Sequence, residues 1–275
     1  AIPVFADIDK KTYNICPNSI EKNITNQTKA IMAIDIFGQS ADMNKIVKIA
    51  KKYNLKIISD TAQAPGAMYD NQFAGTLADV GGFSFNYHKH IHTGEGGVIV
   101  TNDDLIAERL RLIRNHAEAV VLEKGVEDIS NMIGFNFRLG EIESAIGIEQ
   151  LKKLNSKILR RQKIAERLTK GLKNLAGLKT PYIEKSCSHV FYVYALQVDS
   201  LITGIHRDKI FDALKAEGVP IGKKYGNLHL LPLFQKKIAY GKKGFPWNSE
   251  ICKRNVNYDR GICPISEKLN DNEIL

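Results

Sequence analysis

Two side chains in the first hundred residues have the type and the position to act on a bound cofactor. Asp60 follows the apolar run at residues 55–59, and ligands of open α/β sheets bind beyond the carboxyl ends of the strands. A carboxylate there can pair with a cationic group, or it can simply cap the following turn. Lys89 follows a second apolar run. A lysine amine that attacks a carbonyl needs a partly desolvated position in which to lose its proton.

Glycines surround the stretch after Lys89, at positions 94, 96 and 97. They permit tight turns and a close approach of the backbone, which would hold a lysine side chain against a flat ligand. Any single lysine is more often a solvated surface residue. The order of the parts favours a site instead: an Asp after one strand, Ser84 and Lys89 after the next, and then the glycine-rich turn.

The elements that must position these residues alternate between strand and helix. Residues 29–36 and 55–59 are apolar runs typical of strands buried on both faces. Between them lies a helix with apolar residues at a spacing near 3.6, namely Met43, Ile46, Val47, Ala50 and Tyr53. This βαβ unit predicts a parallel pair. Residues 80–85 and 98–101 are predicted strands, and Asp103 caps a helix whose expected core face is Leu105, Ile106, the stem of Arg109, Leu110 and Ile113.

The rest of the chain predicts a smaller second domain. Residues 116–138 read as loop, and a long helical pattern runs from about 139 to 172, which places a boundary near residue 155. Beyond it we expect a strand at 190–198, a helix at 207–217 that ends at Gly218, and a short strand at 219–221. The fold class is therefore α/β, with a mostly parallel sheet in a large domain (1–155) and a smaller α+β domain (156–275).

Composition excludes several classes of protein. The chain has 275 residues, about two ordinary domains, with 44% hydrophobic and 25% charged residues, the balance of a globular protein. No apolar run reaches the roughly 18 residues of a membrane helix. The net charge of +9 is spread along the chain without a nucleic-acid-binding motif, so it suits an anionic small ligand better. Four cysteines without regular spacing favour a reducing, cytoplasmic compartment.

Three motifs resemble one enzyme family. They are residues 59–67 (SDTAQAPGA), the pattern Ser84-Phe85-(x3)-Lys89-(x4)-Gly94-Glu95-Gly96-Gly97, and residues 134–138 (GFNFR). Together they resemble the DegT/DnrJ/EryC1/StrS aminotransferases, pyridoxal-phosphate (PLP) enzymes of fold type I, the aspartate-aminotransferase-like fold. The likeness runs in order from residues 3–7 to residues 263–267.

The resemblance implies a role for each matched residue. Lys89 would hold PLP as a Schiff base and carry the proton between cofactor and substrate carbons, and Asp60 would keep the pyridine nitrogen protonated. Gln63 would lie near the ring hydroxyl, and Ser84 would bind the cofactor phosphate. Asn136 would reach the phosphate in the neighbouring subunit, which makes the expected active unit a homodimer.

Substrate contacts are expected in the second domain. Residues 225–234 match the family's substrate-facing loop, with Tyr225 and His229 as candidate contacts to the sugar nucleotide, although ordinary loop packing explains them equally well. His189 is a further candidate of the same kind. Relatives commonly have His where Asp35 stands, so no role is carried over to that position.

Histidines at 88, 90 and 92 flank the lysine. On an extended segment they would share one face, which makes a metal site conceivable. No cysteine or carboxylate cluster completes such a site, so a lining role around the cofactor or an interface is favoured, and no metal is expected. Some 3-dehydratases of the family have histidine in place of the Schiff-base lysine, whereas position 89 is Lys, which favours transamination.

The resulting hypothesis is transfer of an amino group from glutamate to a keto-sugar nucleotide of the NDP-4-keto-6-deoxyhexose type, for surface-polysaccharide or amino-sugar biosynthesis. The alternatives are amination of a keto-cyclitol, deoxygenation of a sugar, and a non-catalytic relative. The partners are then the sugar nucleotide, glutamate and a second copy of the chain, with neither nucleic acid nor membrane. Relatives carry further segments at both ends, so we expect residues 1–275 alone to hold PLP poorly.

Overall fold

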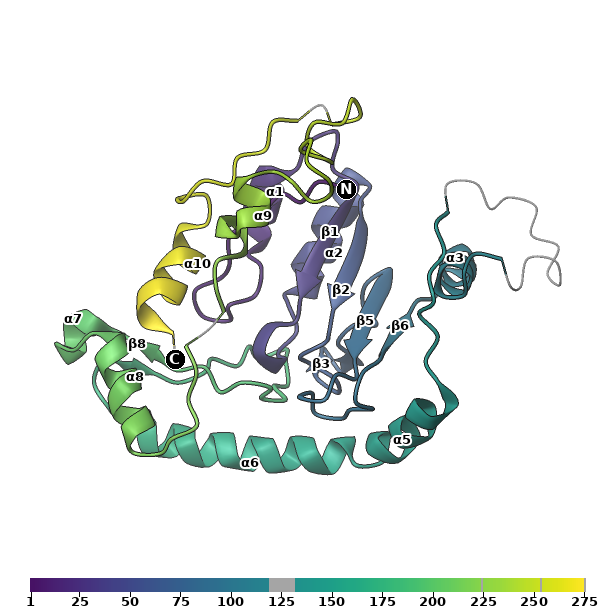
Figure 1. The fold of residues 1–275 in the computed structure, drawn as a ribbon. Helices are drawn as coiled ribbons and strands as arrows, with labels where there is room; N and C mark the ends of the chain where they lie inside the picture. The colour runs from purple at the N-terminus through teal and green to yellow at the C-terminus, as the bar shows by residue number, and fades with distance from the viewer. Residues whose placement is uncertain (119–131, 224, 253, 275) are drawn as a thin grey trace. The chain divides into compact units, whose positions relative to one another are not determined.

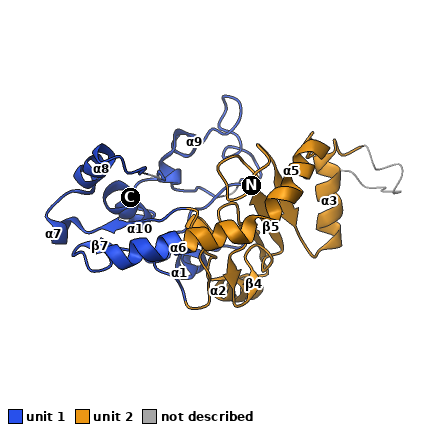
Figure 2. Cartoon of the chain, turned by 90° about the horizontal axis from the view of Figure 1, so that it is seen from below, with its two compact units in different colours: residues 1–28, 163–184, 193–275 blue, residues 29–162, 185–192 orange. Residues whose placement is uncertain are grey.

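The protein, seen in a computed structural model, is described at residues 1–118, 132–223, 225–252 and 254–274 (Figure 1). It forms two compact units (Figure 2). Unit 1 comprises residues 1–28, 163–184 and 193–275, and unit 2 comprises residues 29–162 and 185–192. The sequence placed one boundary near residue 155, whereas both units are assembled from separate stretches of the chain.

Unit 2 is built on a four-stranded sheet in the order β1-β2-β5-β6. Strands β1, β2 and β5 are mutually parallel, and β6 runs antiparallel to β5. The predicted α/β class with a mostly parallel sheet is thus confirmed. The elements of unit 2 are β1 (Ala30–Ile34), η1 (Ile36–Gly38), α2 (Met43–Tyr53), β2 (Lys56–Asp60), β3 (Met68–Tyr69), β4 (Gln72–Phe73), β5 (Val80–Ser84), β6 (Gly97–Val100), α3 (Asp104–Arg114), α5 (Glu141–Leu151) and the first part of α6 (Leu154–Leu172).

Local sequence explains the βαβ unit at the start of the sheet. Asp42 begins α2 by accepting from the backbone N–H of Lys45, and Asn54 ends it in the left-handed conformation that Asn tolerates. Strand β1 alternates between buried and exposed residues: Ile31 is buried, whereas Met32 is 58% exposed. The expectation that this strand is buried on both faces is therefore wrong for the described chain.

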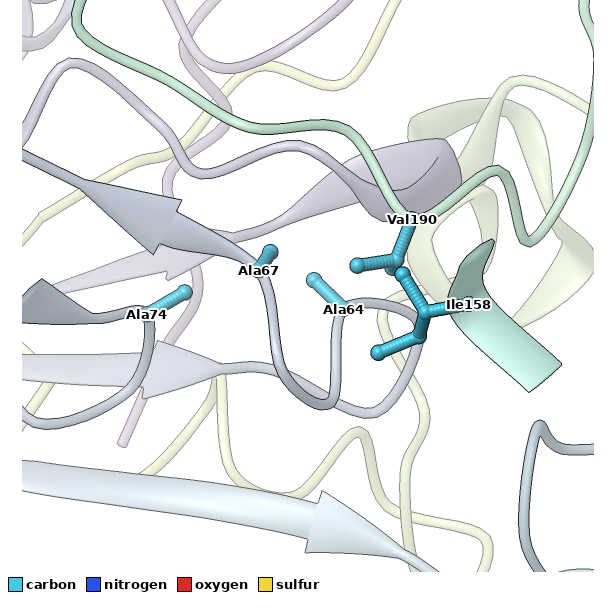
Figure 3. Close-up of a cluster of buried hydrophobic side chains, with 5 residues drawn as sticks. All are labelled: Ala64, Ala67, Ala74, Ile158 and Val190. Atoms are coloured by element: carbon cyan, nitrogen blue, oxygen red, sulfur yellow. The ribbon is translucent and has the colours of Figure 1, made fainter. Parts of the chain in front are cut away.

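A small apolar cluster connects the loop after β2 to distant parts of unit 2 (Figure 3). It consists of the buried side chains Ala64, Ala67, Ala74, Ile158 and Val190. Ile158 comes from α6, and Val190 comes from the segment 185–192, which follows much later in the chain. Apolar packing therefore holds a late segment of the chain against the loop that follows Asp60.

Unit 1 consists of short elements around aromatic and aliphatic side chains. Phe5, Phe234, Tyr258 and Trp247 pack with ring centroids 5.0 to 6.4 Å apart. Its elements are α1 (Pro17–Asn23), the second part of α6, β7 (Leu178–Lys179), β8 (Gln197–Val198), α7 (Ser200–Thr203), α8 (Arg207–Ala216), η2 (Leu228–Leu230), α9 (Pro232–Gln235), α10 (Pro264–Lys268) and the π-helical turn η3 (Leu269–Glu273).

Several predicted elements differ in the structure. The long helix is two helices, because Lys153 N–H donates to the Gln150 carbonyl in a tight turn between α5 and α6. Of the predicted strand 190–198 only β8 is a strand, since Phe191 has a φ of 48° that an extended strand does not allow. No strand forms at 219–221 because the Val219 N–H bonds back to the Leu214 carbonyl at the end of α8.

Helix α3 begins at its predicted cap, Asp103, but the residues that it buries differ from the predicted core face. Leu112 is its buried residue, whereas Leu105 lies in the first turn and is 74% exposed. Of the predicted loop 116–138, residues 119–131, including Gly125, lie outside the described residues. Among the described residues, no helix has both the length and the apolar character needed to cross a bilayer.

Candidate active site

The candidate site starts from two strands of unit 2 that end at the same edge of the sheet. Asp60 is the last residue of β2 and pairs in register with Gly82 of the parallel strand β5, which ends at Ser84. Parallel pairing brings the carboxyl ends of both strands together. Asp60 also accepts from the backbone N–H of Ala62 at 3.1 Å, so its carboxylate is held at the strand end.

Lys89 lies close enough to Asp60 to respond to its charge. The turn after β5 is held by the Asn86 N–H, which donates to Ser84 Oγ, and by the Lys89 N–H, which donates to the Asn86 carbonyl at 3.0 Å. Burial lowers the pKa of the half-buried Lys89 amine, and the charge of Asp60 opposes part of this shift. A lowered amine pKa increases the neutral, nucleophilic fraction at a given pH.

Tyr192 is a neighbour of the lysine that the sequence did not identify. Lys89 Nζ lies 4.8 Å from the centroid of the Tyr192 ring, and the His88 and His90 rings lie at 6.1 and 6.0 Å from it. An ammonium over an aromatic face is attracted to the ring. The only sequence signal for Tyr192 is the aromatic run 191–194, which we assigned to a strand.

The backbone that carries Tyr192 is bound on several sides within unit 2. Val190 N–H donates to the Gly38 carbonyl at 2.8 Å, and Arg161 donates to the Phe191 carbonyl at 2.9 Å. Gly38 has a φ of +112°, and a Cβ there would lie 2.9 Å from the backbone nitrogens of Phe191 and Tyr192. Only glycine allows this close approach.

Two buried imidazoles line the same segment. His90 is 2% exposed and its Nε2 lies 2.9 Å from the Val190 carbonyl; His189 is 6% exposed, stacks on Phe191 and accepts from the Phe191 N–H through Nδ1. Burial lowers the pKa of each to about 4. His189, predicted as a substrate contact, therefore lies in unit 2 with a buried neutral ring.

Gln63, Ser84 and Asn136 have different surroundings. Gln63 Oε1 accepts from the Phe37 N–H at 2.7 Å, which fixes the turn after β2 to the end of β1. Ser84 Oγ belongs to the turn that leads to Lys89. Asn136 is exposed, and its backbone pairs with that of Asn115. The first two lie at the strand edge with Asp60, whereas no described contact joins Asn136 to Asp60 or Lys89.

In unit 1, the two predicted substrate contacts differ in exposure. Tyr225 is 41% exposed. His229 is 2% exposed, and its Nε2 lies 2.9 Å from Oε1 of Glu267, a carboxylate that also accepts from the Gly261 and Cys263 N–H groups. His229 thus takes part in a buried network within unit 1.

The family of the chain follows from comparison with known proteins. The sequence profile of the DegT/DnrJ/EryC1/StrS aminotransferase family matches residues 1–274. The chain belongs to this family.

Two of its relatives in the DegT/DnrJ/EryC1/StrS family have names that refer to polysaccharide biosynthesis and to an amino-sugar nucleotide. The chain is 30% identical to the spore coat polysaccharide biosynthesis protein SpsC of Bacillus subtilis, over 100% of this chain and 71% of that protein. It is 41% identical to a dTDP-3-amino-3,6-dideoxy-alpha-D-galactopyranose transaminase of Aneurinibacillus thermoaerophilus, over 72% and 53%. A crystal structure of a DegT/DnrJ/EryC1/StrS aminotransferase from Brucella abortus superposes with a TM-score of 0.78 at 29% identity, over 100% of this chain and 67% of that one. The chain is thus an aminotransferase of fold type I.

The residues at the sheet edge fit the cofactor that the DegT/DnrJ/EryC1/StrS resemblance implies. The half-buried Lys89 has a lowered pKa and feels the charge of Asp60. Gly94 is exposed and has a φ of +87°, so the turn after Lys89 uses a backbone conformation that favours glycine. Nδ1 atoms of both His90 and His92 are buried without a hydrogen-bond partner. An amine with a lowered pKa and a carboxylate whose charge reaches it suit PLP.

The metal alternative gains no support. The His90 ring is bonded to the Val190 carbonyl. Among the described residues, no group of three or more His, Cys, Asp or Glu side chains could hold a metal ion. The His88 and His90 rings instead pack near the Tyr192 ring, beside Lys89.

Proposed function

We propose that the protein transfers an amino group from glutamate to a keto-sugar nucleotide of the NDP-4-keto-6-deoxyhexose type, with PLP as cofactor. The observation that carries the proposal is the half-buried amine of Lys89, with its lowered pKa, within the field of Asp60 at the carboxyl edge of the sheet. The names of the relatives support a sugar-nucleotide substrate and a role in polysaccharide biosynthesis. None of the four cysteines, all within the described residues, forms a disulfide, which supports a cytoplasmic site of action.

Lys89 and Asp60 divide the chemical work. PLP, when bound, supplies an electron sink that stabilises negative charge on the substrate carbon. The Asp60 carboxylate would hold a proton on the ring nitrogen of the bound cofactor. The Lys89 amine would hold the cofactor in the resting site and, once the substrate amine has displaced it, would accept and return the proton at the substrate carbon, which its lowered pKa favours. The Tyr192 ring, whose centroid lies 4.8 Å from Lys89 Nζ, attracts the ammonium form of the lysine.

The remaining predicted residues complete the proposed site. Ser84 binds the cofactor phosphate, Gln63 orients the ring hydroxyl, and Asn136 serves the neighbouring subunit. Tyr225 is the proposed substrate contact from its loop, since its side chain is 41% exposed. Contacts from His229 and His189 remain predictions, each with a ring that is buried in this chain.

The exposed apolar surface near Asn136 supports the proposed homodimer. Helix α5 has no buried residue, although Ile142, Ile148 and Leu151 lie on it with exposed fractions of 75%, 61% and 61%. Phe137, next to Asn136, is 65% exposed. Exposed apolar patches of this kind mark protein interfaces.

The experiment is mass spectrometry of products formed from ¹⁵N-glutamate and a panel of keto-sugar nucleotides. We expect one mass increment for a new ¹⁵N amine, and a loss of roughly a thousandfold in rate for Lys89→Ala. Borohydride should bleach the visible absorption of the native protein and leave a reduced cofactor on Lys89. Lys51→Ala, on the exposed last turn of α2, is the matched control and should behave as the native protein.

Two outcomes would contradict the proposal. The first is a purified intact protein that shows no PLP absorption after incubation with the cofactor. The second is a product that has lost oxygen without gaining nitrogen, which would indicate deoxygenation.

A further inference from the structure

A fully buried carboxylate lies directly behind the strand that carries Asp60. Asp35 follows β1 and is 0% exposed. Its Oδ2 accepts from Thr61 Oγ1 at 2.7 Å and from Ser59 Oγ at 3.0 Å, and its Oδ1 accepts from the Ala41 N–H at 2.9 Å. Burial raises the pKa of Asp35, and these donors counteract the shift.

The partners of Asp35 flank the proposed cofactor ligand on both sides. Ser59 and Thr61 are the residues immediately before and after Asp60. The backbone N–H of Asp35 also donates to the Asp60 carbonyl at 2.9 Å. One residue therefore binds the main chain of Asp60 and the side chains of both its neighbours.

Strand geometry separates this network from Lys89. Side chains alternate between the two faces of a strand, so Ser59 and Thr61 point to one face while Asp60 points to the other. Their exposure follows this alternation: Ser59 and Thr61 are 1% and 0% exposed, whereas Asp60 is partly exposed and its charge acts on Lys89. Asp35 thus holds the strand end from behind.

The strand end needs such support because the ladder stops there. Ile34 and Asp60 are the last residues paired between β1 and β2, and the last main-chain bond to β5 is the one from Thr61 N–H to the Gly82 carbonyl at 2.8 Å. Residues past a strand end are ordinarily free to adopt other conformations. Side-chain hydrogen bonds to a buried carboxylate restrict that freedom.

We propose that Asp35 is a positioning residue for Asp60, acting through the hydroxyls of Ser59 and Thr61 from the face opposite Lys89. The inference rests on the proposed role of Asp60 as the partner of the cofactor ring. It gives a role to a carboxylate that is 0% exposed and binds the residues on both sides of Asp60.

The test uses Thr61→Val in the intact protein, because valine keeps the shape of the side chain and removes the hydroxyl donor. Two readouts report the position of Asp60. The first is the pH dependence of Lys89 modification by an amine reagent in the cofactor-free protein, followed by peptide mass spectrometry. The second is the affinity for PLP.

Thr61→Val should lower the pKa of Lys89, because a loosened Asp60 stabilises the ammonium less, and should weaken PLP binding about tenfold. Thr61→Ser, which restores the hydroxyl, should recover both values. Thr101→Val is the matched control: that hydroxyl donates to the Asp79 carbonyl at 2.7 Å, before the start of β5, so neither readout should move.

The outcomes separate the two proposals. If Asp60→Asn shifts the Lys89 pKa and PLP affinity while Thr61→Val matches Thr101→Val, the positioning role is overturned and the proposed function stands. If Asp60→Asn changes neither, the proposed function itself fails. Should Thr61→Val not fold, Ser59→Ala removes the other hydroxyl and gives the same decision.

Discussion

Each unit of the protein contains a basic side chain next to a carboxylate, and the two arrangements differ in how completely they are closed. In unit 2, Lys89 is half-buried and feels the charge of Asp60. In unit 1, His229 is buried and bonded directly to Glu267, which also binds two backbone N–H groups. The Lys89 amine stays partly exposed, whereas His229 and Glu267 belong to a buried hydrogen-bond network.

Asp60→Asn should produce the largest change, and it should be a loss of activity. We expect transamination to fall roughly a thousandfold, because the amide cannot hold a proton on the ring nitrogen. The urea unfolding midpoint should change little. Asp70→Asn provides the control, since Asp70 is exposed at a turn with a φ of 46° that Asn tolerates. An unchanged rate in Asp60→Asn would place the chemistry elsewhere.

Glu267→Ala should instead affect stability. Removing one partner of a buried, hydrogen-bonded pair costs about 3 kcal/mol, here because His229 and the Gly261 N–H lose their acceptor. The only tryptophan, Trp247, lies in unit 1 and makes its unfolding visible by fluorescence. Exposed Glu250→Ala should stay within about 0.5 kcal/mol of the native protein. The contrast between the Lys89–Asp60 and His229–Glu267 pairs would fail in either of two cases. Glu267→Ala could have native stability, or it could alter the pKa of Lys89.

Lowering the pH should reduce the stability of unit 2 through two buried imidazoles. His90 and His189 have pKa values near 4 in the fold, against about 6.5 unfolded. Between these values the unfolded chain binds protons that the folded unit 2 does not, so stability falls as the pH drops from 6.5 to 4. Each imidazole contributes at most roughly 3 kcal/mol, and partial hydration reduces this.

The measurement is urea unfolding across this pH range, with hydrogen exchange of the β2 and β5 amides to report on unit 2. His189→Asn retains an acceptor for the Phe191 N–H and should flatten the pH dependence. An equal slope in His189→Asn and the native protein would show that His189 is not the titrating group.

The parts of the site that could be predicted are those placed by strands. Asp60 and Lys89 follow apolar runs, and parallel pairing brings such strand ends together. Tyr192 could not be predicted in the same way, because its position depends on Gly38 and on hydrogen bonds to residues far away in the sequence. The positive φ of Phe191 similarly overrides the strand preference of its neighbours.

In unit 1, too, the features that the sequence could not predict depend on contacts between residues far apart in the chain. The environment of His229 is set by Glu267, which lies 38 residues away and beyond a long irregular stretch. Local pattern carries no information about such a pairing. On α3, the predicted core face included Leu105, yet the side chain that packs inward is Leu112, because neighbouring elements rather than periodicity decide which side of the helix is covered.

The late segment 185–192 has a consequence for how the protein is made. During synthesis the strands β1, β2, β5 and β6 leave the ribosome long before Val190 and Tyr192 exist. Until then, Val190 is not available to pack on Ala64 and Ala67, and Tyr192 is not available to pack near Lys89. Lys89 acquires its final surroundings only after residue 192 has been added, long after Lys89 itself was synthesised.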